Sequence, residues 1–240
     1  MTLPAGSTAL VTGATGAIGR AMALALAGRG ARLLLTGRNE TRLAAAADRA
    51  RELGAETDVR PLDLAAGGAA DELAAHLEER FGGADVLVHA LGAYASGTVA
   101  ETPADELDRQ LRINLRAPYA LTRRLLSGLQ ERRGQIVFVN SSAALRPRGN
   151  LAAYAASKAA LKAVADALRD EVNPDGVRVV SVYPGRTASP MQERVHRAEG
   201  KPYAPERLMQ PEDVAASVLA ALELPRTAEV TDLHLRPMRK

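Results

Sequence analysis

Cysteine and tryptophan are both absent from this 240-residue chain, and aromatic residues make up only 3% of it. Without cysteine the chain has no disulfide, no thiolate ligand for zinc and no thiol nucleophile. This absence is typical of proteins in a reducing compartment, and we expect a cytoplasmic location. Histidine is also scarce, and its four copies lie without the spacing of a metal site, so we expect no metal; they are His76, His89, His196 and His234.

Long apolar runs and a signal sequence are missing as well. No stretch of about 18 uninterrupted apolar residues is present, so we expect no membrane span and no membrane partner. The first residues, MTLPAGSTALVTG, do not join a basic segment to an apolar run and a cleavage site, so we expect no signal peptide. The net charge is only +3, acids are interleaved with the arginines, and aromatic stacking platforms are lacking. We therefore expect no nucleic-acid partner.

What remains is the composition of an ordinary globular protein, with 47% hydrophobic and 25% charged residues. Short β-branched runs alternate with helical segments, and this alternation predicts one α/β domain over residues 1–240. We expect a Rossmann-type, doubly wound, mainly parallel seven-stranded sheet with helices on both faces. The proline-rich segment at about 186–209 predicts a substrate-loop insertion. The expected strands lie at 8–12, 31–36, 56–62, 85–90, 135–140, 177–183 and 229–235.

A glycine-rich turn, TGATGAIG, follows the first predicted strand and opens a helix. Gly13 permits a tight turn, Gly16 lets the backbone approach a pyrophosphate, and Gly19 lets the helix pack closely on the strand. The amides at the helix start and the helix dipole then face the phosphates. The spacing G-x-x-x-G-x-G differs from G-x-G-x-x-G, and a purely structural turn is the alternative. The strand before it and the helix after it favour a dinucleotide site.

The end of the second strand indicates which dinucleotide is bound. NAD-binding domains of this kind usually place an acid there for the ribose 2′-hydroxyl, but no acid precedes Glu40 in this chain. Arg38 follows Gly37 instead, and a guanidinium suits a 2′-phosphate. We therefore expect NADP(H) to be preferred over NAD(H). Asp63, after the third strand, either binds the adenine amino group or caps the helix that follows.

Tyr154 and Lys158 lie four residues apart in a helical segment at 151–161, so they share one face. An ammonium beside a phenol lowers the tyrosine pKa from about 10, and we expect this effect here. Such a tyrosine can protonate a carbonyl oxygen as hydride arrives, or deprotonate an alcohol in the reverse direction. Ser141 and Ser142 follow the strand at 135–140, at the strand end where ligands of open α/β sheets gather.

These motifs, in this order, resemble the short-chain dehydrogenases/reductases from residue 8 to about 235. TGATGAIG matches the family's cofactor turn, and Tyr154-x-x-x-Lys158 matches its catalytic pair. The family's catalytic serine lies thirteen residues before the tyrosine, which is Ser141, with Ser142 as the alternative. Asn114 matches a helix asparagine that supports a water relay to the lysine. The segment 183–187 resembles a Pro-Gly turn whose threonine lies near the nicotinamide amide.

The resemblance implies an enzyme that moves a hydride between NADP(H) and a small carbonyl/alcohol substrate. Tyr154 is its general acid/base, Lys158 holds the nicotinamide ribose, and Ser141 orients the carbonyl. Asn114 feeds protons to the site. The alternative is a non-catalytic NADP(H)-binding sensor or scaffold of the same fold. The expected cofactor contacts are Gly13, Thr15, Gly16, Ile18, Gly19, Arg38, Asp63, Leu64, Ala90, Gly92, Tyr154, Lys158, Pro184, Gly185 and Thr187.

Two further expectations concern assembly and substrate. Pairing of the helices that hold Asn114 and Tyr154 between subunits, as in related proteins, implies a homodimer or homotetramer. Tyr94 and Leu145 are expected to shape the substrate pocket together with the loop at 186–209. The type of substrate does not follow from these residues.

The chain departs from the family pattern after the fourth strand. The family usually has Asn-Asn-Ala-Gly there, and this chain has His89-Ala90-Leu91-Gly92. We expect His89 to be a buried imidazole whose hydrogen bonds are satisfied. The alternative is that it replaces a hydrogen bond of the first asparagine.

Overall fold

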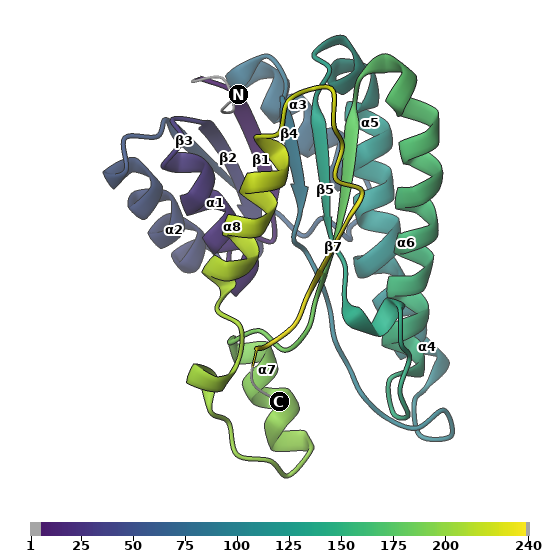
Figure 1. Ribbon diagram of the computed structural model, residues 1–240. Coiled ribbons are helices and arrows are strands. Elements are labelled where there is room, and N and C mark those ends of the chain that lie inside the picture. Colours follow the sequence, from purple (N-terminus) through teal and green to yellow (C-terminus); the bar gives the residue numbers. More distant parts are fainter. Residues whose placement is uncertain (1–5, 239–240) are drawn as a thin grey trace.

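The computed structural model describes residues 6–238, and its seven strands form one sheet (Figure 1). The strand order is β3-β2-β1-β4-β5-β6-β7, and every neighbouring pair is parallel. The prediction of a Rossmann-type sheet is confirmed. The strands are β1 (Thr8–Thr12), β2 (Arg32–Gly37), β3 (Thr57–Pro61), β4 (Val86–His89), β5 (Gln135–Val139), β6 (Arg178–Pro184) and β7 (Asp232–Leu235).

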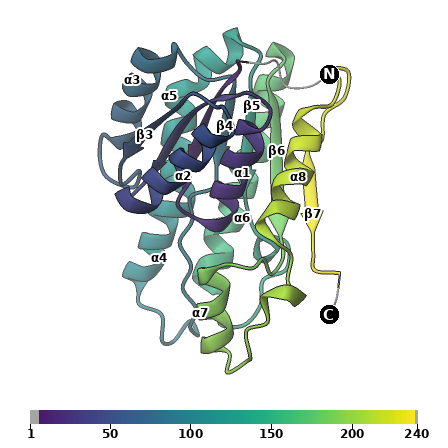
Figure 2. The ribbon, with the colours of Figure 1, turned by 90° about the vertical axis from the view of Figure 1, so that its left-hand side faces the viewer.

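Helices cover both faces of the sheet (Figures 1 and 2). The helices α1 (Ala17–Ala27), α2 (Glu40–Glu52) and α8 (Pro211–Leu222) pack with one set of buried strand residues, which includes Val11. The helices α3 (Ala69–Phe81), α5 (Ala117–Glu131) and α6 (Ala152–Val172) pack with the other set, which includes Leu10. Neighbouring strand residues point to opposite faces, so strands buried on both sides need near-continuous apolar runs.

Two further helices lie toward the carboxyl ends of the strands. The helix α4 (Ala104–Leu111) leads through a π-helical turn (Arg112–Arg116) into α5. The loop predicted at 186–209 contains α7 (Pro190–Ala198) and a single 3-10 turn (Pro205–Arg207). Figure 1 shows α7 beyond the end of the sheet, on the same side as α4. A backbone bridge between Thr187 and Met209 closes the base of this loop.

Short polar side chains determine where several helices begin. Asn39 accepts a hydrogen bond from the Arg42 amide at 2.9 Å and so caps α2. Ser189 accepts one from the Gln192 amide at 3.1 Å and caps α7. Each bond satisfies one of the amides that the first helical turn leaves without a partner.

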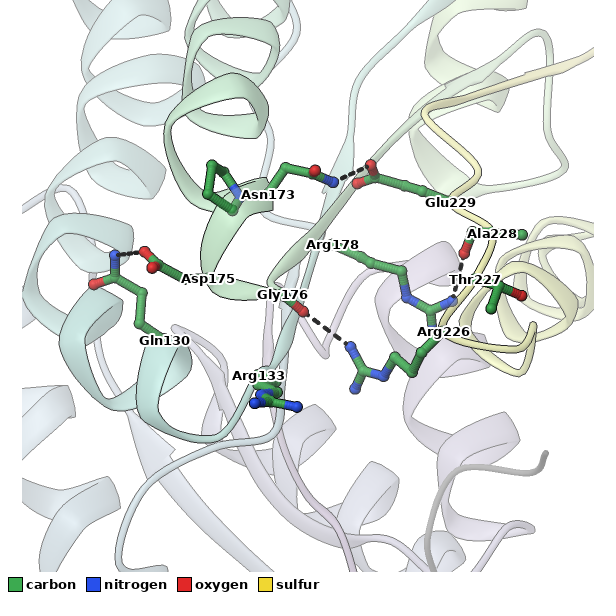
Figure 3. A pocket seen from close by; sticks show the side chains of 11 residues that line it. Gln130, Arg133, Asn173, Asp175, Gly176, Arg178, Arg226, Thr227, Ala228 and Glu229 are labelled. Atoms are coloured by element: carbon green, nitrogen blue, oxygen red, sulfur yellow. Dashed lines mark hydrogen bonds between the residues drawn. The ribbon is translucent and has the colours of Figure 1, made fainter.

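A hollow of about 940 Å³ lies at the amino ends of β5 and β6 (Figure 3). Arg178, the first residue of β6, is buried there. Its guanidinium donates to the carbonyl oxygens of Leu222 and Ala228 at 2.8 and 3.1 Å. Leu222 ends α8, where the last helical carbonyls lack partners within the helix. Arg178 therefore ties the end of α8 to the sheet, at the edge opposite the carboxyl strand ends.

Candidate active site

A cleft of about 1430 Å³ lies at the carboxyl ends of the strands. Its walls are the glycine turn after β1, the segments that follow β2 to β6, the start of α6 and the loop at 186–209. It lies where the strand order reverses between β1 and β4, which is where doubly wound sheets bind their ligands. Every predicted cofactor contact lines this cleft, and so do Ser141, Tyr94 and Leu145; Asn114 is the predicted site residue that does not.

The three glycines of the turn have different roles. Gly13 has a φ of +66°, and a Cβ there would lie 2.6 Å from the Ala90 carbonyl oxygen. A Cβ on Gly19 would collide with the Gly13 carbonyl. Gly16 is exposed in the cleft and forms the N-terminal boundary of α1. Gly13 and Gly19 thus satisfy packing requirements, while Gly16 leaves the amides of the helix start open to a phosphate group.

The end of the cleft beside β2 carries two arginines. Arg38 and Arg42 are both exposed and line the cleft. Asn39 caps α2 and so places Arg42 in its first turn, four residues after Arg38. The sequence motifs missed Arg42, although the cap residue between the two arginines was a usable signal. Two guanidinium groups beside a dinucleotide cleft fit a 2′-phosphate.

Asp63 lies in the cleft but does not cap a helix. Its carboxylate accepts a hydrogen bond from the Ala65 amide at 3.1 Å. The helix α3 begins only at Ala69, with Gly68 as its N-cap residue. The capping alternative for Asp63 is therefore wrong, because residues 62–68 separate the strand from the helix and Asp63 lies five residues before the N-cap residue. Adenine recognition by Asp63 stays a prediction.

Tyr154 lies near the start of α6 with its phenol in the cleft. Burial raises the pKa of this phenol, while a hydrogen bond with the Ser141 side chain acts to lower it. Tyr94 packs edge-on against it, with ring centroids 5.1 Å apart, and further raises the pKa. Our expectation of a lowered tyrosine pKa is wrong for the protein alone, because loss of water around the phenol outweighs the favourable contacts.

Lys158 lies one turn after Tyr154 and is buried. Its Nζ donates to the Val139 carbonyl oxygen at 3.0 Å, at the end of β5. Burial lowers the pKa of Lys158 to about 8. The ammonium also lies beside Gly92, where a Cβ would be 3.9 Å from Nζ. Lys158 is therefore a buried amine one helical turn from Tyr154, with little water around it.

Ser141, rather than Ser142, is the serine at the phenol. The hydroxyl of Ser141 accepts a hydrogen bond from the Ala143 amide at 3.1 Å. The same side chain bonds to Tyr154. Ser142 is exposed and begins a short 3-10 turn. The backbone bond to Ala143 orients the Ser141 hydroxyl toward the mouth of the cleft.

Asn114 lies behind the cleft, buried in the π-helical turn between α4 and α5. Its Oδ1 accepts from the Ala93 amide at 2.7 Å, and its Nδ2 donates to the Ala93 carbonyl and the Ser157 hydroxyl, both at 2.9 Å. Ser157 in turn donates to the Tyr154 carbonyl at 2.8 Å. Asn114 therefore braces the segment after β4 against the helix that carries Tyr154. Its part in a water relay stays a prediction.

His89 is buried at the end of β4, as expected, but its hydrogen bonding is incomplete. The ring stacks on Phe138 with centroids 5.0 Å apart. Its Nε2 lies 2.8 Å from the Thr122 hydroxyl, whereas its Nδ1 has no partner. Burial lowers the pKa of His89 to about 3, so the imidazole is neutral at physiological pH. His89 thus links β4 to α5.

The low pKa of His89 predicts a specific acid sensitivity. As the pH falls from 6.5 to about 3, the unfolded chain takes up a proton at His89 that the folded protein refuses. This proton uptake lowers the free energy of unfolding over that range, by about 2 kcal/mol at pH 5. We expect His89→Asn to lose about 2 kcal/mol less unfolding free energy than the wild type between pH 7.5 and pH 5.

Urea unfolding at the two pH values measures this difference. The control is His234→Asn, which removes a histidine exposed to solvent and should keep the wild-type acid sensitivity. If His89→Asn and the wild type lose equal stability on acidification, the neutral buried imidazole is refuted.

Among residues 6–238, no group of three or more histidines, cysteines or acids is placed to hold a metal ion. Over the same residues, no helix is both long and apolar enough to cross a membrane.

Comparison with known proteins agrees with this geometry. A family model described as short chain dehydrogenase matches residues 7–200. An uncharacterised short-chain type dehydrogenase/reductase of Sinorhizobium fredii is 35% identical over 234 residues, which cover 95% of this chain and 90% of that protein.

Solved structures with the same fold include enzymes bound to either nicotinamide cofactor. An actinorhodin polyketide ketoreductase variant with NADPH superposes with a TM-score of 0.88 at 30% identity, covering 98% of this chain and 97% of that one. A xylitol dehydrogenase with bound NAD+ has a TM-score of 0.89 at 26% identity, covering 97% and 98%. The sequence match over most of the chain and the shared architecture lead to one conclusion: the chain belongs to the short-chain dehydrogenase/reductase family of oxidoreductases.

Proposed function

We propose that the protein is an NADP(H)-preferring oxidoreductase that interconverts a carbonyl and a secondary alcohol on a small substrate. One observation carries this proposal: the Tyr154 phenol, bonded to Ser141, opens into the same cleft as the glycine turn. Lys158 lies in that cleft one helical turn away. A proton donor, an orienting hydroxyl and a buried cation thus share a cleft that fits a dinucleotide.

The nicotinamide, when bound, supplies or accepts the hydride. For reduction, Tyr154 gives its phenolic proton to the substrate oxygen as that oxygen gains charge. The raised pKa of Tyr154 keeps this proton in place at neutral pH. Ser141 donates a hydrogen bond that aligns the carbonyl, and Lys158 stabilises the phenolate that remains. In the oxidation direction the same phenolate removes the alcohol proton.

The preference for NADP(H) is supported by Arg38 and Arg42, which both line the cleft beside β2. Among the lining residues within 6–238, Asp63 and Glu199 are the only acids, and neither is on β2. The ketoreductase neighbour was solved with NADPH and the xylitol dehydrogenase with NAD+, so the neighbours alone do not choose between the two cofactors. The preference for NADP(H) over NAD(H) is therefore inferred from Arg38 and Arg42.

An NADPH-oxidation screen over ketones, aldehydes, quinones and 3-oxo acyl thioesters tests the proposal. We expect at least one class to be reduced, with NADPH used in preference to NADH. Tight NADPH binding with no turnover across the panel would instead favour a cofactor-binding sensor or scaffold. Assembly as a homodimer or homotetramer stays a prediction, and analytical ultracentrifugation measures it directly.

A further inference from the structure

The part of the cleft beside the loop at 186–209 is rich in cations. One wall is the segment between β5 and α6, which contributes Arg146 and Arg148 to the lining. The other wall is the loop at 186–209, which contributes five basic side chains to the lining. They are Arg186, Arg194, His196, Lys201 and Arg207.

The loop at 186–209 carries three acids, Glu193, Glu199 and Glu206, and of these Glu199 is in the described lining of the cleft and neutralises part of that charge. Glu199 accepts two hydrogen bonds from Arg186, at 2.8 and 2.7 Å, and one from Lys201 at 2.8 Å. His196 is buried, and its Nε2 lies 3.2 Å from an Arg186 nitrogen. These contacts join both ends of α7 to the residues that flank it. Their role is to hold the loop in shape.

Four arginines are left over, and we call them the cationic rim: Arg146, Arg148, Arg194 and Arg207. All four side chains are exposed. None forms an ion pair with a carboxylate within the part of the chain that the structure describes. The other arginines of this chain frequently pair with acids on the same helix, as Arg109 does with Glu106. Four unpaired like charges in the lining of one cleft favour the binding of an anion there.

The cationic rim is separate from the charges that the cofactor needs. Arg38 and Arg42 follow β2, whereas the rim arginines follow β5 and β6. Apolar side chains from the same two segments also line the cleft, Leu145 and Leu151 on one wall and Met191, Val195 and Leu208 on the other. A lining that combines apolar and cationic side chains suits a molecule with an apolar body and an anionic end.

Both walls are fixed at their bases, so the rim is a built feature. The Gly97 amide donates to the Asn150 carbonyl at 2.9 Å, and Gly97 pairs with Leu151 in a backbone bridge. On the other wall, the Ala188 amide donates to the Met209 carbonyl at 2.8 Å. Arginines on anchored walls lose less conformational freedom when they bind than arginines on free loops.

We propose that the physiological substrate is an anion, namely a carbonyl compound whose apolar segment ends in a carboxylate or a phosphate monoester held by the cationic rim. This inference rests on the proposed function, because it assigns the substrate of the same cleft. Guanidinium groups bind both anions through paired N–H donors. The rim also raises the local concentration of anions at the mouth of the cleft, an effect that salt weakens.

Matched substrates that differ only in charge test the proposal. The first set is a series of methyl-ketone carboxylates of increasing chain length, each compared with its methyl ester. The second is the series of methyl-ketone phosphate monoesters of the same chain lengths, each compared with its methyl-ketone alcohol. We expect kcat/KM with NADPH to be about tenfold or more higher for the anion in at least one set, and the ratio to shrink as salt is added. The set that shows the preference identifies the anionic group.

Variants connect this preference to the rim. We expect the anion-to-neutral ratio of kcat/KM to fall about tenfold in Arg146→Gln/Arg148→Gln, and likewise in Arg194→Gln/Arg207→Gln. The control Arg49→Gln removes one exposed charge on α2, outside the cleft, and should keep the wild-type ratio. A ratio near one in the wild type, or one that the rim variants leave unchanged, overturns the proposal.

The two proposals fail in different ways. If neutral ketones are reduced as well as the anions, the anionic substrate is refuted and the oxidoreductase assignment stands. If no carbonyl in the panel is reduced, the oxidoreductase assignment fails. In that case, calorimetric titration of the same carboxylates into the protein with NADP+ tests whether the cationic rim binds anions. Binding that the rim variants weaken supports an anion site, and no binding refutes it.

Discussion

Replacing Tyr154 with phenylalanine is expected to lower kcat for carbonyl reduction by about two to four orders of magnitude, the range typical for loss of a general acid. The substitution removes one oxygen and leaves the ring that packs against Tyr94. It also removes a partly buried polar group, so folding should not suffer. NADPH affinity is expected to change little, because the glycine turn and Arg38 are untouched.

Single-turnover kinetics and NADPH fluorescence titration measure these two quantities separately. Tyr119→Phe is the matched control, since Tyr119 is 52% exposed on α5 and lies outside the cleft lining. We expect the control to retain wild-type turnover. A Tyr154→Phe enzyme with near wild-type kcat would remove this tyrosine from the mechanism.

The pKa values of Tyr154 and Lys158 bear on the direction of the proposed reaction. Burial raises the pKa of Tyr154 and lowers that of Lys158 to about 8, so both groups favour their neutral forms more than they would in water. Reduction begins from a protonated phenol, which the protein provides at neutral pH without help. Oxidation needs the phenolate, and rising pH favours it. The sequence places the two residues on one helix face but predicts the wrong direction for the tyrosine pKa, because burial depends on the tertiary structure.

The fold was largely predictable because its signals are local. The central strands of the sheet are short runs of mainly apolar residues, and the helices between the strands end close to glycines such as Gly30, Gly54 and Gly82. These glycines have positive φ values, which other residues rarely adopt. The π-helical turn around Asn114 was not predictable. Its geometry depends on contacts with Ala93 and Ser157, which are distant in sequence.

The candidate site also has parts that the sequence reveals and parts that it does not. Candidate residues at a fixed spacing on one helix, such as Tyr154 and Lys158, could be named from the chain alone. The cationic rim could not, because its members come from two segments that only the fold brings to one cleft. His89 lay between these cases: its burial was expected, but its hydrogen bond with Thr122 joins residues 33 positions apart.

The cofactor preference gives the second large effect. We expect Arg38→Ala to raise the dissociation constant of NADPH about 10- to 100-fold and that of NADH less than about twofold. A hydrogen bond between a guanidinium and a phosphate contributes about 1.5–3 kcal/mol, and only NADPH carries the 2′-phosphate that receives it. Arg42 lies beside Arg38 in the cleft, so removing both arginines should weaken NADPH further than removing either one.

Fluorescence titration of both cofactors against the wild type, Arg38→Ala and Arg38→Ala/Arg42→Ala measures the effect. Arg49→Ala removes a comparable charge from the far end of α2 and should leave both dissociation constants unchanged. The decisive quantity is the NADPH-to-NADH ratio, because a general loss of positive charge weakens both cofactors through their shared pyrophosphate. If Arg38→Ala weakens the binding of NADPH and of NADH by the same factor, the Arg38 guanidinium does not bind the 2′-phosphate. The absence of an acid at the end of β2 would then have another explanation.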